Sequence, residues 1–343
     1  MAPLIRPLDR QRERAWDDFV AATPNGTFFH RAGWKHVVER AFRHRAHYVL
    51  TEQDGAITGV LPLVHVRSFF FGNRLISVPF CVYGGPLAAE SESAALLIDY
   101  SIELAKRVDA NTIEFRARTP VAPEWTTRSD LYATFRKSIS GDSDTNLKAI
   151  PRKQRAVVRK SIDIGLRATV DNNVDRFYDI YAESVRNLGT PVFSQKYLHV
   201  LKEYFNDCLE ILTIFDDDEP VASVLSFFFR DEVLPYYGGG RLQARRRGAY
   251  DFMYWKVMNR AVERGLRVFD FGRSKYGTGA FAFKKNWGFD AQPLPYQYWV
   301  SPGHSIPDLN PLNPKYHLMI NAWKRLPLPL ANLLGPAVAR GIG

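Results

Sequence analysis

The same order of elements occurs twice along this chain of 343 residues, and this repetition constrains the fold more than any other feature. In each half, two runs of strand-forming residues are followed by Tyr-Gly-Gly, which begins at Tyr83 in the first half and at Tyr237 in the second. A stretch with helical spacing and another strand come next. Ile113, in the last strand of the first half, lies 30 residues after Tyr83, and Val268 lies 31 residues after Tyr237. This recurrence predicts a duplicated α/β unit.

The expected elements can be placed by residue number. Residues 174–188 and 196–205 have the apolar spacing of amphipathic helices. The first copy is expected to contain strands at residues 59–67, 75–80 and 111–116 and a helix at 93–108, and the second copy strands at 220–230, 233–237 and 267–271 and a helix at 248–264.

The length and composition suit two domains. The chain is 46% apolar and can therefore bury a large core, and a polar segment at residues 138–147 has the character of a linker. We expect an N-terminal domain at residues 1–140, a C-terminal domain at 141–305 and a tail at 306–343.

The charge and the rare residue types limit the classes of site. The formal net charge of +10 favours an anionic partner, such as a phosphate, a nucleotide, RNA or an acidic membrane face. The two cysteines and eight histidines show no CxxC or HExxH spacing, so neither a disulfide framework nor a metal site is expected. No signal peptide and no stretch of roughly 20 apolar residues is recognised. A cytoplasmic protein with buried free thiols is expected.

A glycine-rich segment in the second half is a candidate anion site. Gly238, Gly239 and Gly240 would let backbone amides approach an anion in a turn, and the N-terminus of the following helix adds positive potential. No GxxxxGK[ST] sequence of a P-loop is present. A basic surface loop is the alternative interpretation. The guanidinium groups that can bind phosphates here belong to Arg241, Arg245, Arg246 and Arg247.

Polar residues also occupy the last strand of the second copy. Asp270 lies between two phenylalanines, and Arg273 and Lys275 follow at the strand end, where residues commonly line sites in α/β folds. Asp270 can act as a general base that faces a cleft. Alternatively, it forms a structural ion pair with Arg273 or Lys275, which the flanking cations favour.

The sequence Phe-Lys-Lys-Asn-Trp at residues 283–287 supplies further candidates. Lys284 and Lys285 are adjacent, so one points into a site if the other is solvated, and a lysine beside an oxyanion stabilises it. Trp287 packs in the core or stacks on a base or sugar ring, and Tyr237 packs or offers its phenol to an acceptor. No Ser, Cys or His forms a recognisable triad, which favours direct transfer in a ternary complex.

A basic helix is expected at residues 151–160, just after the linker. Its charged face is either simply solvated or forms an arm over an anionic ligand in the cleft between the halves. The cations considered for this arm are Lys153, Arg155 and Arg159, with Arg152 and Lys160 beside them.

One family resemblance is carried by residues 248–289, which read GAYDFMYWKVMNRAVERGLRVFDFGRSKYGTGAFAFKKNWGF. This segment resembles the FemAB family of aminoacyltransferases, and in particular the FemAB-like proteins associated with exosortase/PEP-CTERM and exopolysaccharide gene sets. Residues 147–155 resemble the basic Leu-Pro-Arg-Lys stretch of the family. The resemblance spans residues 25–300 and is specific in the second half.

The resemblance implies a tandem duplicated GNAT fold, in which two α/β domains of the acyl-CoA N-acyltransferase type each contain a mixed sheet. It also implies a reaction class, because the wider family transfers an aminoacyl group from charged tRNA to an amine of a peptidoglycan precursor. Lys284 matches the functional lysine of the family's Phe-Lys-x-x-aromatic motif. The chain lacks a long heptad-bearing insertion like the family's coiled-coil arm, which leaves acyl-CoA or another activated donor open. No tightly bound cofactor is implied.

The tail contains an apolar stretch at residues 323–340 that is interrupted by prolines and too short to span a bilayer. It can lie in the interface of an anionic membrane, as a peripheral contact on the inner face of the cytoplasmic membrane. Alternatively, it packs on the protein's own core. The cations of the tail are Lys315, Lys324, Arg325 and Arg340.

Together these features favour an acyl- or aminoacyltransferase that forms an amide on a glycan or peptidoglycan-type precursor of the cell envelope or of an exopolysaccharide. Aminoacyl-tRNA and acyl-CoA both remain as co-substrates, so an acyl-CoA-dependent N-acyltransferase is the nearest alternative. An alternative of another class is a protein of degenerate transferase fold that binds an anionic glycan or RNA without turnover.

Overall fold

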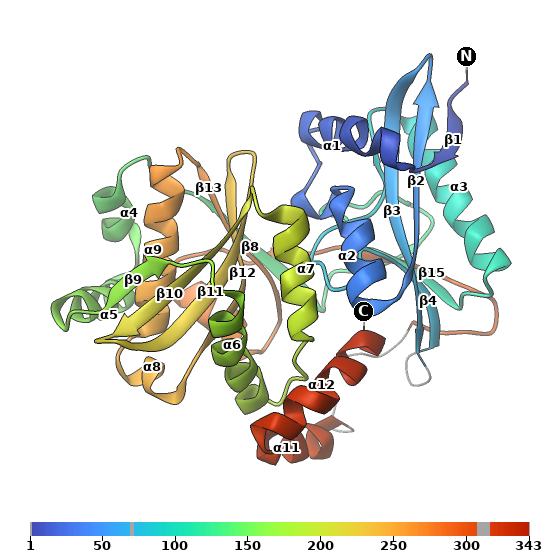
Figure 1. Ribbon diagram of the computed structural model, residues 1–343. Coiled ribbons are helices and arrows are strands. Elements are labelled where there is room, and N and C mark those ends of the chain that lie inside the picture. Colours follow the sequence, from blue (N-terminus) through green and yellow to red (C-terminus); the bar gives the residue numbers. More distant parts are fainter. Residues whose placement is uncertain (1, 69–71, 307–315, 343) are drawn as a thin grey trace. The chain divides into compact units, whose positions relative to one another are not determined.

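The computed structural model describes residues 2–68, 72–306 and 316–342. The chain divides into two compact units (Figure 1). The first unit comprises residues 1–132, 293–309 and 340–343, and the second comprises residues 133–292 and 310–339. This division differs from the expected boundaries at residues 140 and 305, and the sheet topology explains the difference.

The first unit is built on a mixed sheet in the order β1-β2-β3-β4-β6-β15-β7, with β5 paired to β3. β4 and β6 run parallel, whereas β3 pairs antiparallel with both β2 and β4. Its strands are β1 (Leu4–Pro7), β2 (Arg45–Gln53), β3 (Ala56–Ser68), β4 (Gly72–Ser77), β5 (Leu87–Ala88), β6 (Thr112–Phe115), β7 (Thr126–Arg128) and β15 (Tyr296–Val300). Its helical segments are η1 (Arg10–Arg12), α1 (Glu13–Ala22), η2 (Phe28–His30), α2 (Gly33–Phe42) and α3 (Ser91–Arg107).

The second unit is built on a mixed sheet in the order β14-β8-β13-β12-β11-β10-β9. Its strands are β8 (Tyr132–Ser138), β9 (Arg167–Val170), β10 (Leu209–Asp216), β11 (Glu219–Phe229), β12 (Glu232–Gly240), β13 (Val268–Lys275) and β14 (Gln292–Pro293). Its helices are α4 (Ser143–Ala149), α5 (Arg152–Asp163), α6 (Val174–Leu188), α7 (Gln195–Phe205), α8 (Leu242–Arg246), α9 (Ala249–Glu263), α10 (Gly279–Asn286), α11 (His317–Arg325) and α12 (Leu328–Ile342).

Helices cover both faces of the second sheet. Figure 1 shows α9 on one face and α6 and α7 on the other. The main core lies on the α9 face, where Trp255 and Met258 belong to one buried cluster with Phe269 and Phe271 of β13. Burial of such large apolar side chains supplies most of the stability of the unit.

The predicted duplication is confirmed by the topology of the two sheets. In the first sheet, β3 and β4 are antiparallel, α3 follows, and β6 returns parallel to β4. In the second sheet, β11 and β12 are antiparallel, α9 follows, and β13 returns parallel to β12. Both crossovers use a helix, as a parallel connection requires.

Each sheet is completed by a strand from the other half of the sequence. β8 follows the first copy in the chain, yet it lies beside β13 in the second sheet. β15 follows the second copy, yet it pairs antiparallel with β6 in the first sheet. The expected boundaries had placed β8 in the first domain and β15 in the second, because of their positions in the sequence. The alternation of apolar and polar residues along a strand does not specify which of two similar sheets the strand joins.

The two amphipathic helices predicted in the second half are confirmed as α6 and α7. The Asn173 side chain accepts a hydrogen bond from the Arg176 backbone at the start of α6, and Gly189 ends that helix with φ of 81°. Ser194 caps α7 through the backbone N–H of Tyr197. Such side-chain caps satisfy donors that a helix leaves unpaired at its first turn.

The C-terminal tail forms two helices, α11 and α12, although it contains several prolines. Pro329 lies in the first turn of α12, where the missing N–H removes no helical hydrogen bond, and Pro336 lies farther inside the helix. Across residues 2–68, 72–306 and 316–342, no helix combines the length and the apolar character that crossing a membrane requires.

Candidate functional site

The parallel strands β12 and β13 separate soon after they begin. Their register pairs Glu232 with Val268 and Val233 with Phe269, although β12 has nine residues and β13 eight. On its other edge, β12 stays paired with β11 as far as Gly240. After Val233, no residue of β12 is paired with a residue of β13 in the described part of the chain. Backbone groups on such an edge can bind a ligand.

The three glycines of the predicted turn lie inside strand β12, so the predicted turn is wrong. They pair with Val224, Ser223 and Ala222 of β11, and none has a positive φ. A Cβ on Gly239 would lie 2.9 Å from the Tyr181 Cα of α6, and a Cβ on Gly240 would lie 2.9 Å from the Tyr250 ring of α9. The glycines of this segment are Gly238, Gly239 and Gly240. They allow helices to approach both faces of the strand closely, which is a packing requirement that a turn motif does not reveal.

The C-terminal half of β13 is held in an irregular conformation by Asp270 and Lys284. The backbone N–H of Gly272 donates to Asp270 Oδ1 at 2.7 Å, and Gly272 has a φ of 64°. Lys284 Nζ, from α10, donates to the carbonyl oxygens of Phe271, Gly272 and Arg273 at 2.7, 3.1 and 3.1 Å. Three successive carbonyls of a regular strand alternate in direction, so their convergence on one ammonium marks a local distortion. This distortion, the Gly272 bulge, begins just after the last residue of β13 that pairs with β12.

The environment of Lys284 disfavours its charge. Burial lowers the pKa of its ammonium from 10.5 to about 7, and Asp270 opposes this shift. The rings of Phe135 and Phe271 lie 5.4 and 6.0 Å from Nζ. A lysine with such a pKa exchanges a proton near neutral pH, which is the range that acid–base catalysis uses.

An arginine from β8 neutralises two buried carboxylates beside this bulge. Arg136 Nε lies 3.0 Å from Asp270 Oδ2, and its Nη2 contacts Glu232 Oε2 of β12. Both carboxylates are buried. Buried carboxylates require such partners, because an unpaired charge there is strongly destabilising.

The interpretation from sequence considered only Arg273 and Lys275 as partners for Asp270. Arg136 was missed because residues 1–140 had been assigned to the other domain, and Glu232 was missed because its ion pair depends on Arg136. No local sequence signal would have paired β8 with β13. The general-base role of Asp270 stays a prediction, and its engagement by Arg136 favours the structural one.

The residues around Lys284 differ in exposure from one another. Lys285, the next residue, is exposed on α10. Trp287 is buried, and its Nε1 donates to Asp251 Oδ1 at 2.9 Å. Stacking of Trp287 on a ligand, one of the two predicted roles, is therefore contradicted by its place in the core, where aromatic side chains contribute large buried areas.

Tyr237 lies in a cluster of aromatic rings on β12, α6 and α7. Its Oη is 2.8 Å from Tyr197 Oη, and its ring centroid lies 5.6 Å from Tyr181 and 5.7 Å from Phe193. Tyr237 thus packs among aromatic rings, which is one of the two roles considered for it.

The four arginines after the glycines fall into two pairs. Arg241 contacts Glu219 at 3.1 Å, and Arg247 contacts Asp216 at 2.7 Å. Arg245 and Arg246 are exposed on α8, and neither has an ion-pair partner among the described residues. Arg245 and Arg246 are therefore better suited to bind an external anion than Arg241 and Arg247.

The basic helix α5 lies next to these arginines within the second unit. Ser161 Oγ is 3.0 Å from the carbonyl oxygen of Arg247, which joins α5 to the start of α9. The guanidinium of Arg155 donates to the backbone oxygen of Lys148, whereas Lys153 and Arg159 are exposed. Exposed cations thus lie on two adjoining helices, α5 and α8.

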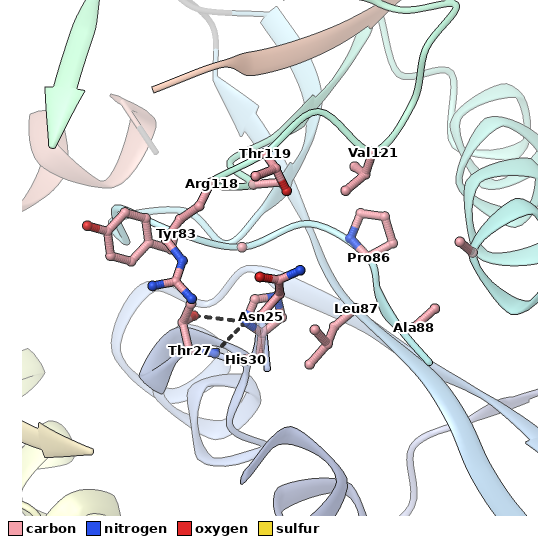
Figure 2. A pocket seen from close by; sticks show the side chains of 13 residues that line it. Asn25, Thr27, His30, Tyr83, Pro86, Leu87, Ala88, Arg118, Thr119 and Val121 are labelled. Carbon is pink, nitrogen blue, oxygen red and sulfur yellow. Dashed lines mark hydrogen bonds between the residues drawn. The ribbon is translucent and has the colours of Figure 1, made fainter. Parts of the chain in front are cut away.

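The first unit contains a pocket of about 220 Å³ that sequence reasoning missed (Figure 2). It lies where the chain leaves the parallel strands β4 and β6, because Tyr83, Gly84 and Pro86 follow β4, and Ala117 to Val121 follow β6. Ligands in α/β folds commonly bind beyond the carboxyl ends of parallel strands. The first Tyr-Gly-Gly was therefore a signal for this pocket, although it was used only as evidence of duplication.

The two Tyr-Gly-Gly sequences adopt different structures. In the first copy the motif lies in the loop between β4 and β5, and a Cβ on Gly84 would lie 2.1 Å from the Ser77 carbonyl oxygen. Gly85 has a φ of 104°. Only glycine fits both positions. In the second copy the motif is part of strand β12.

Polar groups converge on this first-unit pocket. The backbone N–H of Thr27 donates to His30 Nδ1 at 3.2 Å, and Thr27 Oγ1 lies 2.8 Å from the same nitrogen (Figure 2). Because Nδ1 accepts, a neutral His30 carries its proton on Nε2. The Arg118 guanidinium lies 5.7 Å from the Tyr83 ring centroid, and Asn25 also lines the pocket.

The cysteines and the possible metal ligands were also considered. Both cysteines, Cys81 and Cys208, are buried, and neither forms a disulfide in the described part of the chain. The described ranges contain no group of three or more His, Cys, Asp or Glu side chains arranged to hold a metal ion.

One family match covers part of the chain. Residues 147–285 match the acetyltransferase (GNAT) domain family. This segment includes α5, the glycines of β12, Asp270 and Lys284. No curated protein matches the chain.

Solved structures resemble nearly the whole chain. The crystal structure of FemX has a TM-score of 0.66 at 14% identity and covers 87% of this chain and 97% of its own. The structure of L-PGS from Bacillus licheniformis has a TM-score of 0.54 at 15% identity, with 98% of each chain covered. A tandem GNAT protein from the clavulanic acid biosynthesis pathway has a TM-score of 0.55 at 13% identity and covers 88% of this chain and 99% of its own.

The chain therefore has the tandem GNAT fold, and residues 147–285 match the GNAT acetyltransferase domain family. The expected fold class is confirmed. The domain match supports an enzyme of the acyltransferase type. Fold alone does not define the substrates, which depend on the residues of the site.

Proposed function

We propose that this protein transfers an acyl or aminoacyl group to an amine of a cell-envelope or exopolysaccharide precursor, directly from donor to acceptor in a ternary complex. One observation carries the proposal. Inside the GNAT domain, β13 leaves β12 at a bulge that is fixed by Asp270 and by Lys284, whose pKa is about 7. The end of the β12–β13 register and the titratable lysine thus occur together.

The reaction needs three contributions from the protein. The amine nitrogen attacks the donor carbonyl carbon, the bond from that carbon to the leaving sulfur or oxygen breaks, and the amine proton passes to a base. Backbone N–H groups on the edge of β12 are suited to bind the donor and to stabilise the oxyanion. Lys284 contributes first by fixing the carbonyls of β13, since its ammonium already donates to three of them. A direct contact with the oxyanion would require one of these bonds to break.

Two donor classes fit the basic surface of the second unit. Arg245 and Arg246 on α8 are exposed just before Gly248, which precedes α9, and Lys153 and Arg159 lie exposed on the adjoining α5. Both acyl-CoA and aminoacyl-tRNA present phosphates that such cations bind. The GNAT match favours acyl-CoA. The likeness to the C-terminal domain of a putative lysylphosphatidylglycerol synthetase from Agrobacterium fabrum, with a TM-score of 0.54, favours a lysyl and therefore an aminoacyl donor.

The pocket of the first unit is itself proposed to bind a small polar group. Its volume of about 220 Å³ is below the range of about 300–1,000 Å³ that drug-sized ligands need. It therefore suits one sugar ring or one amino-acid side chain of a larger precursor. Arg118 and Asn25 offer donors for hydroxyl or carboxylate oxygens, as a glycan or peptidoglycan-type precursor presents.

The test is a transfer assay on the full chain with each donor class and amine-bearing precursors, with products identified by mass spectrometry. We expect an amide product with one donor, and thermal stabilisation by that donor. Lys284→Met should lower kcat/KM at least about 100-fold, as loss of a group that organises a catalytic site does. Lys284→Arg should recover part of the activity, and Lys285→Met should stay close to the wild type because that side chain is exposed.

One outcome would favour the non-catalytic alternative. If no donor gives a product, but RNA or an anionic glycan binds in a salt-dependent way that Arg245→Gln/Arg246→Gln weakens, the protein is a binding module on a transferase fold. The salt dependence reports the number of phosphates or carboxylates that the cations neutralise.

A further inference from the structure

Large apolar side chains are concentrated on the surface of the two C-terminal helices. Of the eleven that are exposed in the described ranges, six lie between residues 318 and 338. Leu318 on α11 is 85% exposed, and Leu333 on α12 is 73% exposed. Single exposed leucines are ordinary, but a cluster of this kind marks an interaction surface. The six residues are Leu318, Met319, Leu330, Leu333, Leu334 and Val338.

Helix α12 has two apolar faces, and its smaller residues are the buried ones. Ala331, Gly335 and Ala339 recur every four residues and are buried. A Cβ on Gly335 would lie 2.9 Å from the Val192 backbone nitrogen, so this face is packed tightly against the second unit. The leucines therefore point outward. A helix of a soluble protein normally buries its large apolar residues instead.

The last residues of α12 are held by hydrogen bonds. Arg74 Nη2 donates to the carbonyl oxygens of Gly341 and Ile342 at 3.2 and 2.8 Å, and His44 Nε2 lies 3.0 Å from the Arg340 carbonyl oxygen. Arg74 and His44 are buried. A guanidinium at these carbonyls satisfies acceptors that the helix leaves unpaired at its C-terminus. The leucine face is thus presented by a helix whose opposite face packs against the second unit.

The charge of this segment selects the partner. The sequence contains no Asp or Glu after Asp308, while Lys315, Lys324, Arg325 and Arg340 are cationic. Lys324, Arg325 and Arg340 are exposed on α11 and α12. A surface that is both apolar and positive complements an anionic lipid surface. A second copy of this chain would bring the same positive charges together, which opposes dimerisation through this face.

We propose that α11 and α12 form a docking surface for an anionic lipid bilayer, with the leucine face in the acyl-chain boundary and the cations at the headgroups. α12 has 15 residues and is about 22 Å long. It is expected to lie along the bilayer surface, since the face opposite the leucines is engaged by the second unit. This docking is independent of the transfer reaction and holds for a binding module as well.

The test is co-sedimentation of the full chain with vesicles of phosphatidylcholine alone and of phosphatidylcholine mixed with phosphatidylglycerol. We expect binding to the mixed vesicles that weakens as salt is raised. Leu330→Ser/Leu333→Ser should weaken it at least about tenfold, because two exposed leucines lose their apolar contact with the bilayer. Lys324→Gln/Arg325→Gln should weaken it by about 30-fold, or about fivefold for each cation near the surface.

Matched variants separate this surface from general stickiness. Leu4→Ser/Ile162→Ser removes two side chains of similar exposure elsewhere, at 60% and 45%, and Arg10→Gln/Arg14→Gln removes two exposed cations. Both should bind mixed vesicles like the wild type.

Two results would overturn the proposal. One is equal vesicle binding by Leu330→Ser/Leu333→Ser and the wild type, with melting temperatures that confirm folding. The other is a stable dimer in light scattering that this variant abolishes, since the face would then be an interface between copies.

Discussion

Lys284 gives the sharpest test of the site, because its environment predicts how stability depends on pH. Its folded-state pKa of about 7 is below the ordinary value of 10.5. Between these two pH values the unfolded chain holds a proton at Lys284 that the folded chain has released. Stability must therefore rise with pH across this window. Below pH 7 both states are protonated and the cost of burying the charge is constant; above pH 10.5 both are neutral and the cost is absent.

The magnitude follows from the size of the shift. One proton gives a slope of at most about 1.4 kcal/mol per pH unit, and a shift from 10.5 to about 7 corresponds to about 5 kcal/mol in full. The side chain is only partly buried, so solvent screening reduces this value. We expect a gain in the free energy of unfolding of about 2–4 kcal/mol between pH 7 and pH 10.

Lys284→Met removes the proton and keeps most of the volume. The variant leaves the carbonyl oxygens of Phe271, Gly272 and Arg273 without their donor, which costs stability at every pH. The pH-dependent gain should disappear. The assay is urea unfolding followed by fluorescence at pH 7, 8, 9 and 10, with Lys285→Met as the control that keeps the wild-type slope. Equal slopes for the wild type and Lys284→Met would refute the assigned environment of the lysine.

Three further predictions concern the scaffold of the site. Gly239→Ala should lower the free energy of unfolding by about 1–3 kcal/mol, measured as a lower urea midpoint, because its Cβ would lie 2.9 Å from the Tyr181 Cα. Asp270→Asn should lower it by about 2–4 kcal/mol, since Arg136 loses the partner that balances its charge, and an unchanged midpoint would contradict the pairing. A fragment of residues 1–140 should fail to give a folded, soluble product in a circular-dichroism melt, because its sheet lacks β15; a cooperative transition would show that the first copy is independent of that strand.

Local patterns predicted the elements well. The helices expected at residues 174–188 and 196–205 are α6 and α7, because apolar spacing, caps and helix-ending glycines are all encoded within one or two turns. The order of strand, strand, helix and parallel strand was likewise predicted from the sequence in both copies. The glycines of β12 were misinterpreted, since a turn and a closely packed strand favour the same residue.

The sequence predicted only those residues of the candidate site that lie on β13 and α10. Asp270 and Lys284 were identified from the motif and its resemblance, and the structure brings both to the Gly272 bulge. Arg136 and Glu232 were not identified, because ion pairs between strands depend on which strands become neighbours. Trp287 was assigned to a ligand surface as one alternative, but the structure places it in the core.

The sequence by itself determined that this chain contains two copies of one α/β unit, since periodicity and spacing are local properties that recur. Tertiary structure alone decided which strand completes each sheet. β8 and β15 are short strands that either copy could accommodate by pattern, and only the packing of complete sheets selects between them. The pairing of β8 with β13 places Arg136 beside Asp270. The charge balance of the candidate site therefore arises from a long-range pairing that no local pattern encodes.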